Sequence, residues 1–494
     1  MTETATTVTS THSVAAEEAA SLGARNRLVI SLLLISAFVV ILNETIMGVA
    51  LPRLMTDLDI PASSAQWLTT AFMLTMAVVI PITGFLLQRF NTRPLFIAAM
   101  GLFSLGTLIA AVSPGFEILL IARVVQASGT AIMFPLLMTT VMTLVPAESR
   151  GRMMGNISIV ISVAPAIGPT ISGLILHSLN WRWMFILVLP IALAALIVGG
   201  VLMKNVTDPR PTRCDVLSVI LSAIGFGGLV YGLSIAGTAS NALQVWLPLG
   251  VGIAALILFV LRQLRLQRDD RALLDLRTFS NRTFTFSIIM FAISMMALFG
   301  TIVLLPLYMQ NVLKIDALPT GLLMLPGGLF MGLLAPFVGR IYDRVGPTAL
   351  LVTGSIIVSA DLWAMTMLGQ NSSYWWVLAA HVTLSIGLAL LFTPLFSASL
   401  GAVRPELYSH GSAIVGTVQQ LAGAAGTALF VTVMSAVAAH LTPGGGAPGI
   451  AATASGIHTA FIFGAVISTF AIPVAFFIRK AGSPNDAGGA PVGH

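Results

Sequence analysis

Long stretches without a charged residue recur along the whole chain, for example at 28–42 and 184–203. An α-helix needs about 20 residues to cross the ~30 Å hydrocarbon core of a bilayer. Soluble domains carry about 25% charged residues, whereas this chain of 494 residues has 9% and is 57% hydrophobic. The apolar residues are continuous rather than alternating, which excludes an outer-membrane β-barrel. The sequence therefore predicts an all-α integral membrane protein.

The lengths of these stretches predict fourteen transmembrane helices. We place them at residues 28–51, 65–87, 95–112, 118–145, 154–177, 183–203, 215–236, 244–262, 283–308, 319–339, 348–368, 374–400, 411–440 and 458–478. Before the first of them, Glu17 and Glu18 stand where a cleavable signal peptide would carry basic residues, so we expect the first helix to be retained.

The distribution of Lys and Arg predicts the orientation. Of the 24 basic residues, only Arg53, Arg182 and Lys314 fall in connections on the side away from the N-terminus, and Arg123 falls inside a helix. The other basic residues lie on the side of the N-terminus. Because such segments face the cytoplasm, we expect a multi-pass protein of the inner (plasma) membrane with both termini cytoplasmic.

Charged segments divide the predicted helices into groups of six, two and six. We expect a cytoplasmic N-terminal tail at 1–27, a six-helix bundle at 28–203, a two-helix insert with cytoplasmic linkers at 204–282, a second six-helix bundle at 283–480 and a cytoplasmic C-terminal tail at 481–494.

A short repeat indicates that the two six-helix bundles are related. Gly84 and Arg89 follow the second predicted helix, and Gly339 and Arg344 follow the tenth helix at the same offset of 255 residues. Parallel repeats related by an axis along the membrane normal give this kind of correspondence.

Motifs of membrane enzymes and ATP-driven pumps are absent from the sequence. None of the lysines precedes Ser or Thr, so no phosphate-binding loop is expected and no use of ATP. The histidines include no pair at metal-ligand spacing, Cys214 is the only cysteine, and no Gly-x-Ser-x-Gly or His-Glu-x-x-His sequence occurs. We expect no metal, no cofactor and no nucleic-acid partner. A transporter is the leading interpretation, and a lipid-modifying membrane enzyme is the alternative.

Four motifs, met in order along the chain, resemble signatures of one transporter family. The sequence 84–90 resembles the helix 2–3 loop of the major facilitator superfamily. The sequences 42–52, 121–129 and 164–173 are similar to the helix-1, helix-4 and helix-5 motifs of its fourteen-helix drug:proton antiporter branch, the EmrB/QacA type. The resemblance covers about residues 28–480. It implies the major facilitator fold, with two six-helix halves and two inserted helices.

The chain departs from the family pattern at three motif positions. Asn43 stands where the helix-1 motif usually has Asp, although Glu44 lies next to it. Gln88 and Asn91 stand where the first loop usually has Asp and Gly, whereas the second copy keeps Asp343 and Gly346.

The resemblance also implies functional roles for ionisable residues at membrane depth, where charges are rare and costly. We expect Glu44 to carry the coupled proton and Arg123 to tune it, although the two could form a structural ion pair instead. Asp361 is a weaker coupling candidate, because its helix is peripheral in the family fold.

The remaining site candidates divide between a substrate cavity and a gate. For the cavity we expect Asn43, Trp67, Gln126, Met295, Phe299, His381 and Gln419, although His381 could be a packing residue and the aromatic and methionine side chains could face lipid or core. For the gate and its motifs we expect Gly84, Gln88, Arg89, Arg93, Gly168, Pro169, Gly173, Gly339, Asp343, Arg344 and Gly346.

Together these features predict a proton-coupled exporter of neutral or monocationic lipophilic compounds, of the multidrug efflux type, working by alternating access. We expect a small lipophilic substrate, protons and the lipid bilayer as partners, and a monomer. A dedicated exporter of one endogenous amphiphile or metabolite is the nearest alternative.

Overall fold

The computed structural model describes residues 3–206, 209, 215–236, 241–442 and 449–479, and this part of the chain is helical without strands. The long helices are α1 (Glu3–Asp57), α2 (Ala62–Arg89), α3 (Thr92–Ala111), α4 (Phe116–Leu144), α5 (Arg150–Ser178), α6 (Arg182–Leu202), α7 (Val216–Ile235), α8 (Ala242–Leu266), α9 (Arg282–Asn311), α10 (Ala317–Val345), α11 (Pro347–Met365), α12 (Tyr374–Gly401), α13 (Tyr408–His440) and α14 (Ile450–Thr469). The short α15 (Ala471–Ala475) continues α14.

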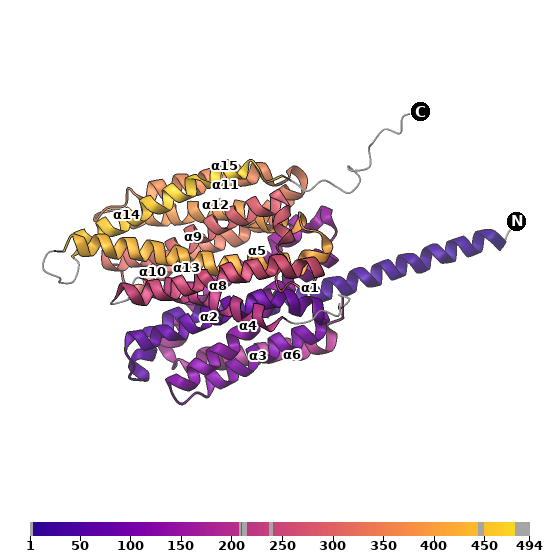
Figure 1. The fold of residues 1–494 in the computed structure, drawn as a ribbon, viewed down its shortest axis with the longest axis horizontal. Helices are drawn as coiled ribbons and strands as arrows, with labels where there is room; N and C mark the ends of the chain where they lie inside the picture. Colours follow the sequence, from indigo (N-terminus) through magenta and orange to yellow (C-terminus); the bar gives the residue numbers. More distant parts are fainter. Residues whose placement is uncertain (1–2, 207–208, 210–214, 237–240, 443–448, 480–494) are drawn as a thin grey trace.

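Fourteen helices in the described residues are long and apolar enough to cross a membrane, which confirms the count predicted from the sequence. The main difference lies at the start of α1, which begins at Glu3 rather than near residue 28 and projects beyond the bundle (Figure 1). Residues 14–20 are rich in Ala and Glu, which have high intrinsic helix propensity.

The helices form two six-helix halves, α1–α6 and α9–α14, that lie side by side (Figure 1). Within the first half, α3 packs on α4 and α6, and α1 packs on α5; within the second, α13 packs on α9 and α14, and α11 on α12. The halves meet along two lines. We call them the α5–α10 seam and the α2–α13 seam, after the helices that touch there.

Small residues allow the close approach of α5 and α10. A Cβ atom added at Gly339 would lie 2.2 Å from the carbonyl oxygen of Gly151, and one added at Gly155 would lie 2.5 Å from that of Ala335. Farther along the same seam, a Cβ at Gly328 would lie 2.2 Å from the Cβ of Ala166. Helices in membranes use small residues in this way to bring backbones together.

The inserted helices α7 and α8 pack on each other, and α7 lies against the α2–α13 seam. Val230 of α7 forms one buried cluster with Ala77 of α2 and Ala424 of α13. Tyr231, the next residue, stacks on Trp67 of α2 with 5.7 Å between the ring centroids. The insert therefore touches both halves.

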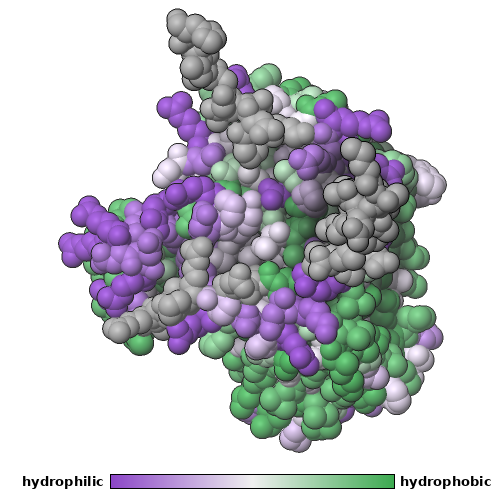
Figure 2. Space-filling view, turned by 90° about the vertical axis from the view of Figure 1, so that its right-hand side faces the viewer, coloured by the Kyte–Doolittle hydropathy of each residue, from purple (hydrophilic) through white to green (hydrophobic). Residues whose placement is uncertain are grey.

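We call one end of the bundle the basic end, because the α2–α3, α4–α5, α8–α9, α10–α11 and α12–α13 connections there carry most of the arginines. Figure 2 looks onto this end and shows hydrophilic residues spread across it, with hydrophobic residues along the flank.

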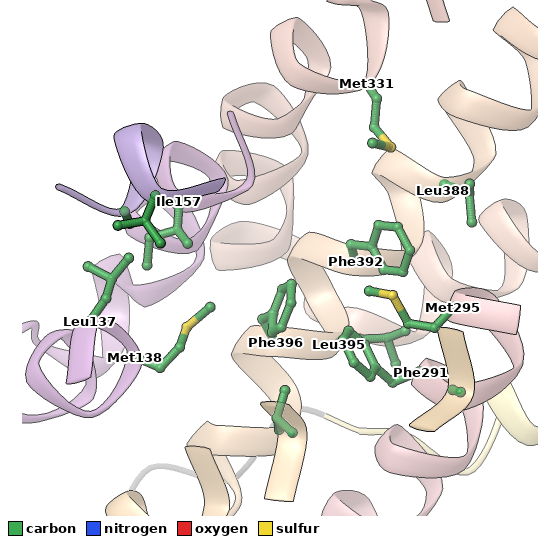
Figure 3. Packing of buried hydrophobic residues seen from close by; sticks show 14 of the residues in the cluster. Leu137, Met138, Ile157, Phe291, Met295, Met331, Leu388, Phe392, Leu395 and Phe396 are labelled. Atoms are coloured by element: carbon green, nitrogen blue, oxygen red, sulfur yellow. The ribbon is translucent and has the colours of Figure 1, made fainter. Parts of the chain in front are cut away.

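Toward the basic end, an apolar cluster joins the two halves. Figure 3 shows Leu137 and Met138 of α4 and Ile157 of α5 facing Phe396 of α12. Phe396 also lies 6.0 Å from Phe134 of α4, measured between ring centroids.

Candidate functional site

Arg123 lies in the first half with only 1% of its surface exposed, and its direct polar contacts are with uncharged groups. Its Nη1 donates to Gln126 Oε1 at 2.6 Å and to Asn43 Oδ1 at 3.4 Å, and its Nε donates to the Leu68 carbonyl at 3.4 Å. The guanidinium lies over the ring of Phe72, 4.0 Å from the centroid, as in a cation–π contact. The predicted residues Asn43, Gln126 and Arg123 are thus brought together.

Glu44 is half-buried on α1, next to Asn43 in the chain. Among the described residues its carboxylate makes no ion pair within 4.0 Å of Arg123, yet the two charges lie close enough to interact electrostatically. The structural ion pair that the sequence left open is therefore not formed in this structure. Neutral oxygen atoms, rather than the carboxylate, hold the guanidinium.

The helix-5 motif packs against α1 beside this acid. A Cβ added at Gly168 would lie 2.3 Å from Thr45 Oγ1, so α5 can approach α1 only because residue 168 is a glycine. Gly173 has open space where a Cβ would be, and the side chain of Pro169 lies outside the described part. The close contact made by Gly168 is thus within the first half, and the contact between halves is made by other residues of α5.

His381 and Asp361 are buried in the second half and lie apart from the Arg123 cluster. His381 Nε2 lies 3.1 Å from the Met324 carbonyl of α10, two residues before Pro326 in this helix. The His381 ring also packs on Gly327, where an added Cβ would lie 2.4 Å from it. Asp361 is 5% exposed on α11, and its Oδ2 has no hydrogen-bond partner among the described residues.

The other cavity candidates do not converge on one surface in this structure. Trp67 stacks on Tyr231 of the insert. Met295 is 1% exposed and lies close to Phe392 and Phe291 (Figure 3). Phe299 packs on Gly423 of α13, where a Cβ would lie 3.1 Å from its ring, and Gln419 is half-buried on α13.

At the basic end, Asp343 joins the two halves across the α5–α10 seam. Its Oδ1 and Oδ2 accept hydrogen bonds from the backbone N–H groups of Gly151 and Arg152, both at 2.8 Å. These are the first residues of α5, where unpaired N–H groups and the helix dipole favour a negative charge. Gly346 follows with φ of 80°, a left-handed conformation that favours glycine.

Gln88 makes the matching contact at the α2–α13 seam. Its Nε2 lies 2.8 Å from Nε2 of His410 and 3.5 Å from the Glu406 carbonyl. An amide nitrogen can only donate, so the imidazole accepts through Nε2 and carries its proton on Nδ1. A Cβ added at Gly84 would lie 3.1 Å from His410 Nδ1, which places Gly84 in the same contact.

The arginines of the two loops make fewer contacts. Arg93 donates from Nε to the Gly200 carbonyl of α6 at 2.8 Å, and its backbone N–H donates to Asn205 Oδ1 at 3.1 Å. Arg89 and Arg344 are exposed, and neither side chain makes a hydrogen bond or ion pair among the described residues. The sequence does not single out His410, because only the folded chain brings it beside Gln88.

Hydrogen bonds between the halves concentrate toward the basic end. Besides the Asp343 and Gln88 contacts, Thr393 Oγ1 donates to Ser158 Oγ at 2.9 Å, and Gln420 Nε2 lies 3.7 Å from Met76 Sδ. No hydrogen bond joins the halves at the opposite end within the described part of the chain. The structure is therefore closed at its basic end.

Comparisons with known proteins identify a family. A family model described as the Major Facilitator Superfamily matches residues 33–427. The chain is 42% identical to the lincomycin resistance protein LmrB of Listeria monocytogenes, over 92% of this chain and 97% of that protein. It is 41% identical to the uncharacterized MFS-type transporter YcnB of Bacillus subtilis, over 92% and 96%. Among solved structures, the human organic anion transporter MFSD10 superposes with a TM-score of 0.62 at 14% identity, covering 91% of this chain and 99% of that one.

Proposed function

Because the chain belongs to the major facilitator superfamily, in its multidrug-efflux branch, we propose that it is a proton-coupled antiporter that exports neutral or monocationic lipophilic compounds. Its relatives are named as transporters and resistance proteins, so an enzymatic activity is set aside. We propose further that it acts as a monomer in the plasma membrane, with both termini and the basic end in the cytoplasm.

The observation that carries this proposal is the arrangement of Glu44 beside Arg123. A carboxylate at membrane depth is energetically costly, and such groups mark functional sites. Glu44 has no direct partner among the described residues, whereas Arg123 is held by Asn43, Gln126 and Leu68. A proton can therefore be added to or removed from Glu44 without breaking a salt bridge.

The proposed cycle follows from these contacts. In the form closed at the basic end, Glu44 takes a proton from outside as substrate leaves. The Asp343 and Gln88 contacts then separate, the opposite end closes, and the proton is released inside as substrate binds. Arg123 stays charged throughout and favours the ionised carboxylate.

The charge of the site limits the substrate. One acid and one fixed cation, among amide and apolar side chains, cannot offset the desolvation of a dication. Asp361 lies on α11, which packs on other helices of the second half, so it does not supply a second carboxylate next to Glu44. Neutral or singly positive lipophilic molecules fit this site, held by apolar contact with a few polar groups fixing their orientation.

The test is drug-stimulated proton movement in proteoliposomes. Glu44→Gln should bind substrate but lose gradient-driven transport, because an amide neither takes up nor releases a proton at physiological pH. Glu117→Gln is the matched control, since Glu117 is an exposed acid at the start of α4. It should transport like the wild type. Transport by Glu44→Gln at the wild-type rate and with the wild-type pH dependence would contradict the proposal.

A further inference from the structure

The linker between α8 and α9 buries two leucines in an otherwise hydrophilic segment. Leu273 and Leu274 are 2% and 3% exposed, whereas Arg268, Asp269 and Arg271 just before them are exposed. The linker is outside the long helices, so burial here requires that other elements cover it. We call residues 273–274 the linker plug.

The linker plug reaches the Gln88 contact at the α2–α13 seam. A Cβ added at Gly84 would lie 3.4 Å from the Leu273 carbonyl and 3.1 Å from His410 Nδ1, so α2, α13 and the linker converge at one point. The linker plug therefore lies beside a contact that must open when the basic end opens.

Gln263 of α8 holds the linker plug. It is 0% exposed, and its Oε1 accepts hydrogen bonds from the backbone N–H groups of Leu273 at 2.7 Å and Leu274 at 3.3 Å. Its Nε2 donates to Ser218 Oγ of α7 at 2.7 Å. One amide thus connects both inserted helices to the linker plug.

A second set of bonds fixes Ser218. Its hydroxyl and its backbone N–H both donate to Asp215, the N-cap residue of α7. Arg262 of α8 donates to both oxygens of the same carboxylate, at 2.6 and 2.7 Å. The hydrogen bonds from Arg262 lower the pKa of Asp215 to about 2, so this bidentate pair stays ionised at physiological pH.

The far side of the linker is internally braced. Asp275 is 3% exposed and accepts hydrogen bonds from the backbone N–H of Arg277 at 2.9 Å and from its guanidinium. Arg277 also pairs with Asp270, and these two carboxylates raise its pKa. The linker is thus braced by its own ion pairs and attached to the insert through Gln263.

We propose that the two-helix insert anchors the inner gate, with Gln263 as the positioning residue that holds the linker plug against the closed α2–α13 seam. This inference rests on the proposed function, because it takes the basic end as the cytoplasmic gate of an alternating-access transporter. The insert contacts α2 and α13 through Val230, so a change in the arrangement of the halves changes its contacts. Opening of the gate then requires that the linker plug leave either Gln263 or the seam.

The test is hydrogen exchange of the full-length protein in nanodiscs, without substrate or proton gradient. Gln263→Leu leaves two buried N–H groups without an acceptor. Peptides from 270–281 and 405–414 should then exchange roughly tenfold faster or more. Peptides from the opposite ends of α1 and α9 should exchange more slowly, because the population shifts toward the form open at the basic end. This reciprocal change separates a gate shift from general destabilisation, which would speed exchange at both ends.

Three further variants complete the design. Gln263→Glu keeps oxygen acceptors for the linker plug and should restore much of the wild-type pattern. Gln267→Leu is the matched control: Gln267 lies one turn later, and its buried Oε1 has no hydrogen-bond partner in the described residues. It should not produce the reciprocal change. Ser218→Ala removes the hydroxyl that accepts a hydrogen bond from Gln263 and leaves Gln263 itself in place. It should change hydrogen exchange in the same direction but by less, and it replaces Gln263→Leu if that variant does not fold.

Wild-type exchange in Gln263→Leu and Ser218→Ala, faster exchange at both ends, or an equal effect of Gln267→Leu would overturn the proposal. Because the readout needs no transport, loss of the proton-coupled mechanism would leave this result unaffected. Conversely, if Gln263→Leu leaves hydrogen exchange unchanged while the wild type shows proton-driven export, only the proposed role of the insert as an anchor is rejected.

Discussion

At the scale of single residues, Gly168 shows how backbone approach sets up the site. The adjacent residues Glu44 and Thr45 belong to α1, and Thr45 Oγ1 occupies the space where a side chain at position 168 would begin. Thr45 is itself fixed, since its hydroxyl donates to the Leu42 carbonyl at 2.9 Å. The position of the acid therefore depends on a missing methyl group on the neighbouring helix.

Gly168→Ala should consequently destabilise the protein by about 1–3 kcal/mol, the usual cost of overpacking. It should also lower proton-coupled transport, because α1 is displaced at Glu44. Thermal unfolding in detergent and proteoliposome transport would measure the two effects. Gly173→Ala is the control, since nothing lies within 4 Å of its Cβ position. Adding Thr45→Ala to Gly168→Ala should restore stability, and a failure to do so would place the strain elsewhere.

The Asp215–Arg262 pair gives a prediction about pH. A carboxyl group whose pKa is lowered in the folded protein, here from 3.8 to about 2, stabilises the fold at higher pH. That contribution is lost only as pH falls from about 4 toward 2. Asp215→Asn, which keeps a capping side chain, should therefore cost at most about 1 kcal/mol for this partly exposed pair. The cost should be the same at pH 5, 6.5 and 8, and thermal unfolding at the three values would check it.

At the scale of elements, the two loops that repeat in sequence make different contacts between the halves. Asp343 binds two N–H groups at the start of α5, whereas Gln88 makes a neutral bond to His410 at the start of α13. Hydrogen bonds to a charged group contribute about 1.5–3 kcal/mol, against about 1 kcal/mol for neutral ones. The α5–α10 contact is therefore the stronger of the two.

Asp343→Asn should weaken closure of the basic end more than Gln88→Ala does. An Asn oxygen can still accept one N–H, but its NH₂ group faces the other donor, so a loss of about 1.5–3 kcal/mol is expected. Hydrogen exchange of residues 150–156 would report the opening, and transport would report its consequence. Arg344→Gln controls for charge at the next position. Equal effects of Asp343→Asn and Gln88→Ala would mean that charge does not distinguish the two contacts.

The number of helices could be predicted because a membrane imposes one length on every apolar stretch. The contacts that each side chain makes could not be predicted, because they depend on which helices pack together. Nothing in the sequence around Leu273 and Leu274 distinguishes them from other leucines in a charged linker. Trp67 likewise has no local signal that it would stack on Tyr231, which lies in the insert. By contrast, the motifs predict Asn43, Gln126 and Arg123 as site residues, and the structure brings these three side chains together.

At the scale of the whole molecule, the orientation can be tested with single cysteines after Cys214→Ser. Arg53 lies at the end opposite to the basic end, with 58% of its side chain exposed, and Arg268 is exposed in the α8–α9 linker. Arg53→Cys should react with a membrane-impermeant thiol reagent in intact cells. Arg268→Cys should react only after permeabilisation. The reverse pattern would invert the proposed topology, and labelling of both in intact cells would contradict the odd number of crossings, α2 to α8, between them.

The position of α7 also makes the two faces of the protein different for molecules dissolved in the lipid. Beside the α2–α13 seam, the rings of Tyr231 and Trp67 and the cluster of Val230, Ala77 and Ala424 place a third helix against the line between the halves. The α5–α10 seam has no such cover from the insert, which packs on α2 and α13 instead. On the proposed mechanism, a lipophilic compound that diffuses within a leaflet would meet the boundary between the halves at the α5–α10 seam rather than at the covered α2–α13 seam. Capture of such a compound from the bilayer would then be directional in the plane of the membrane.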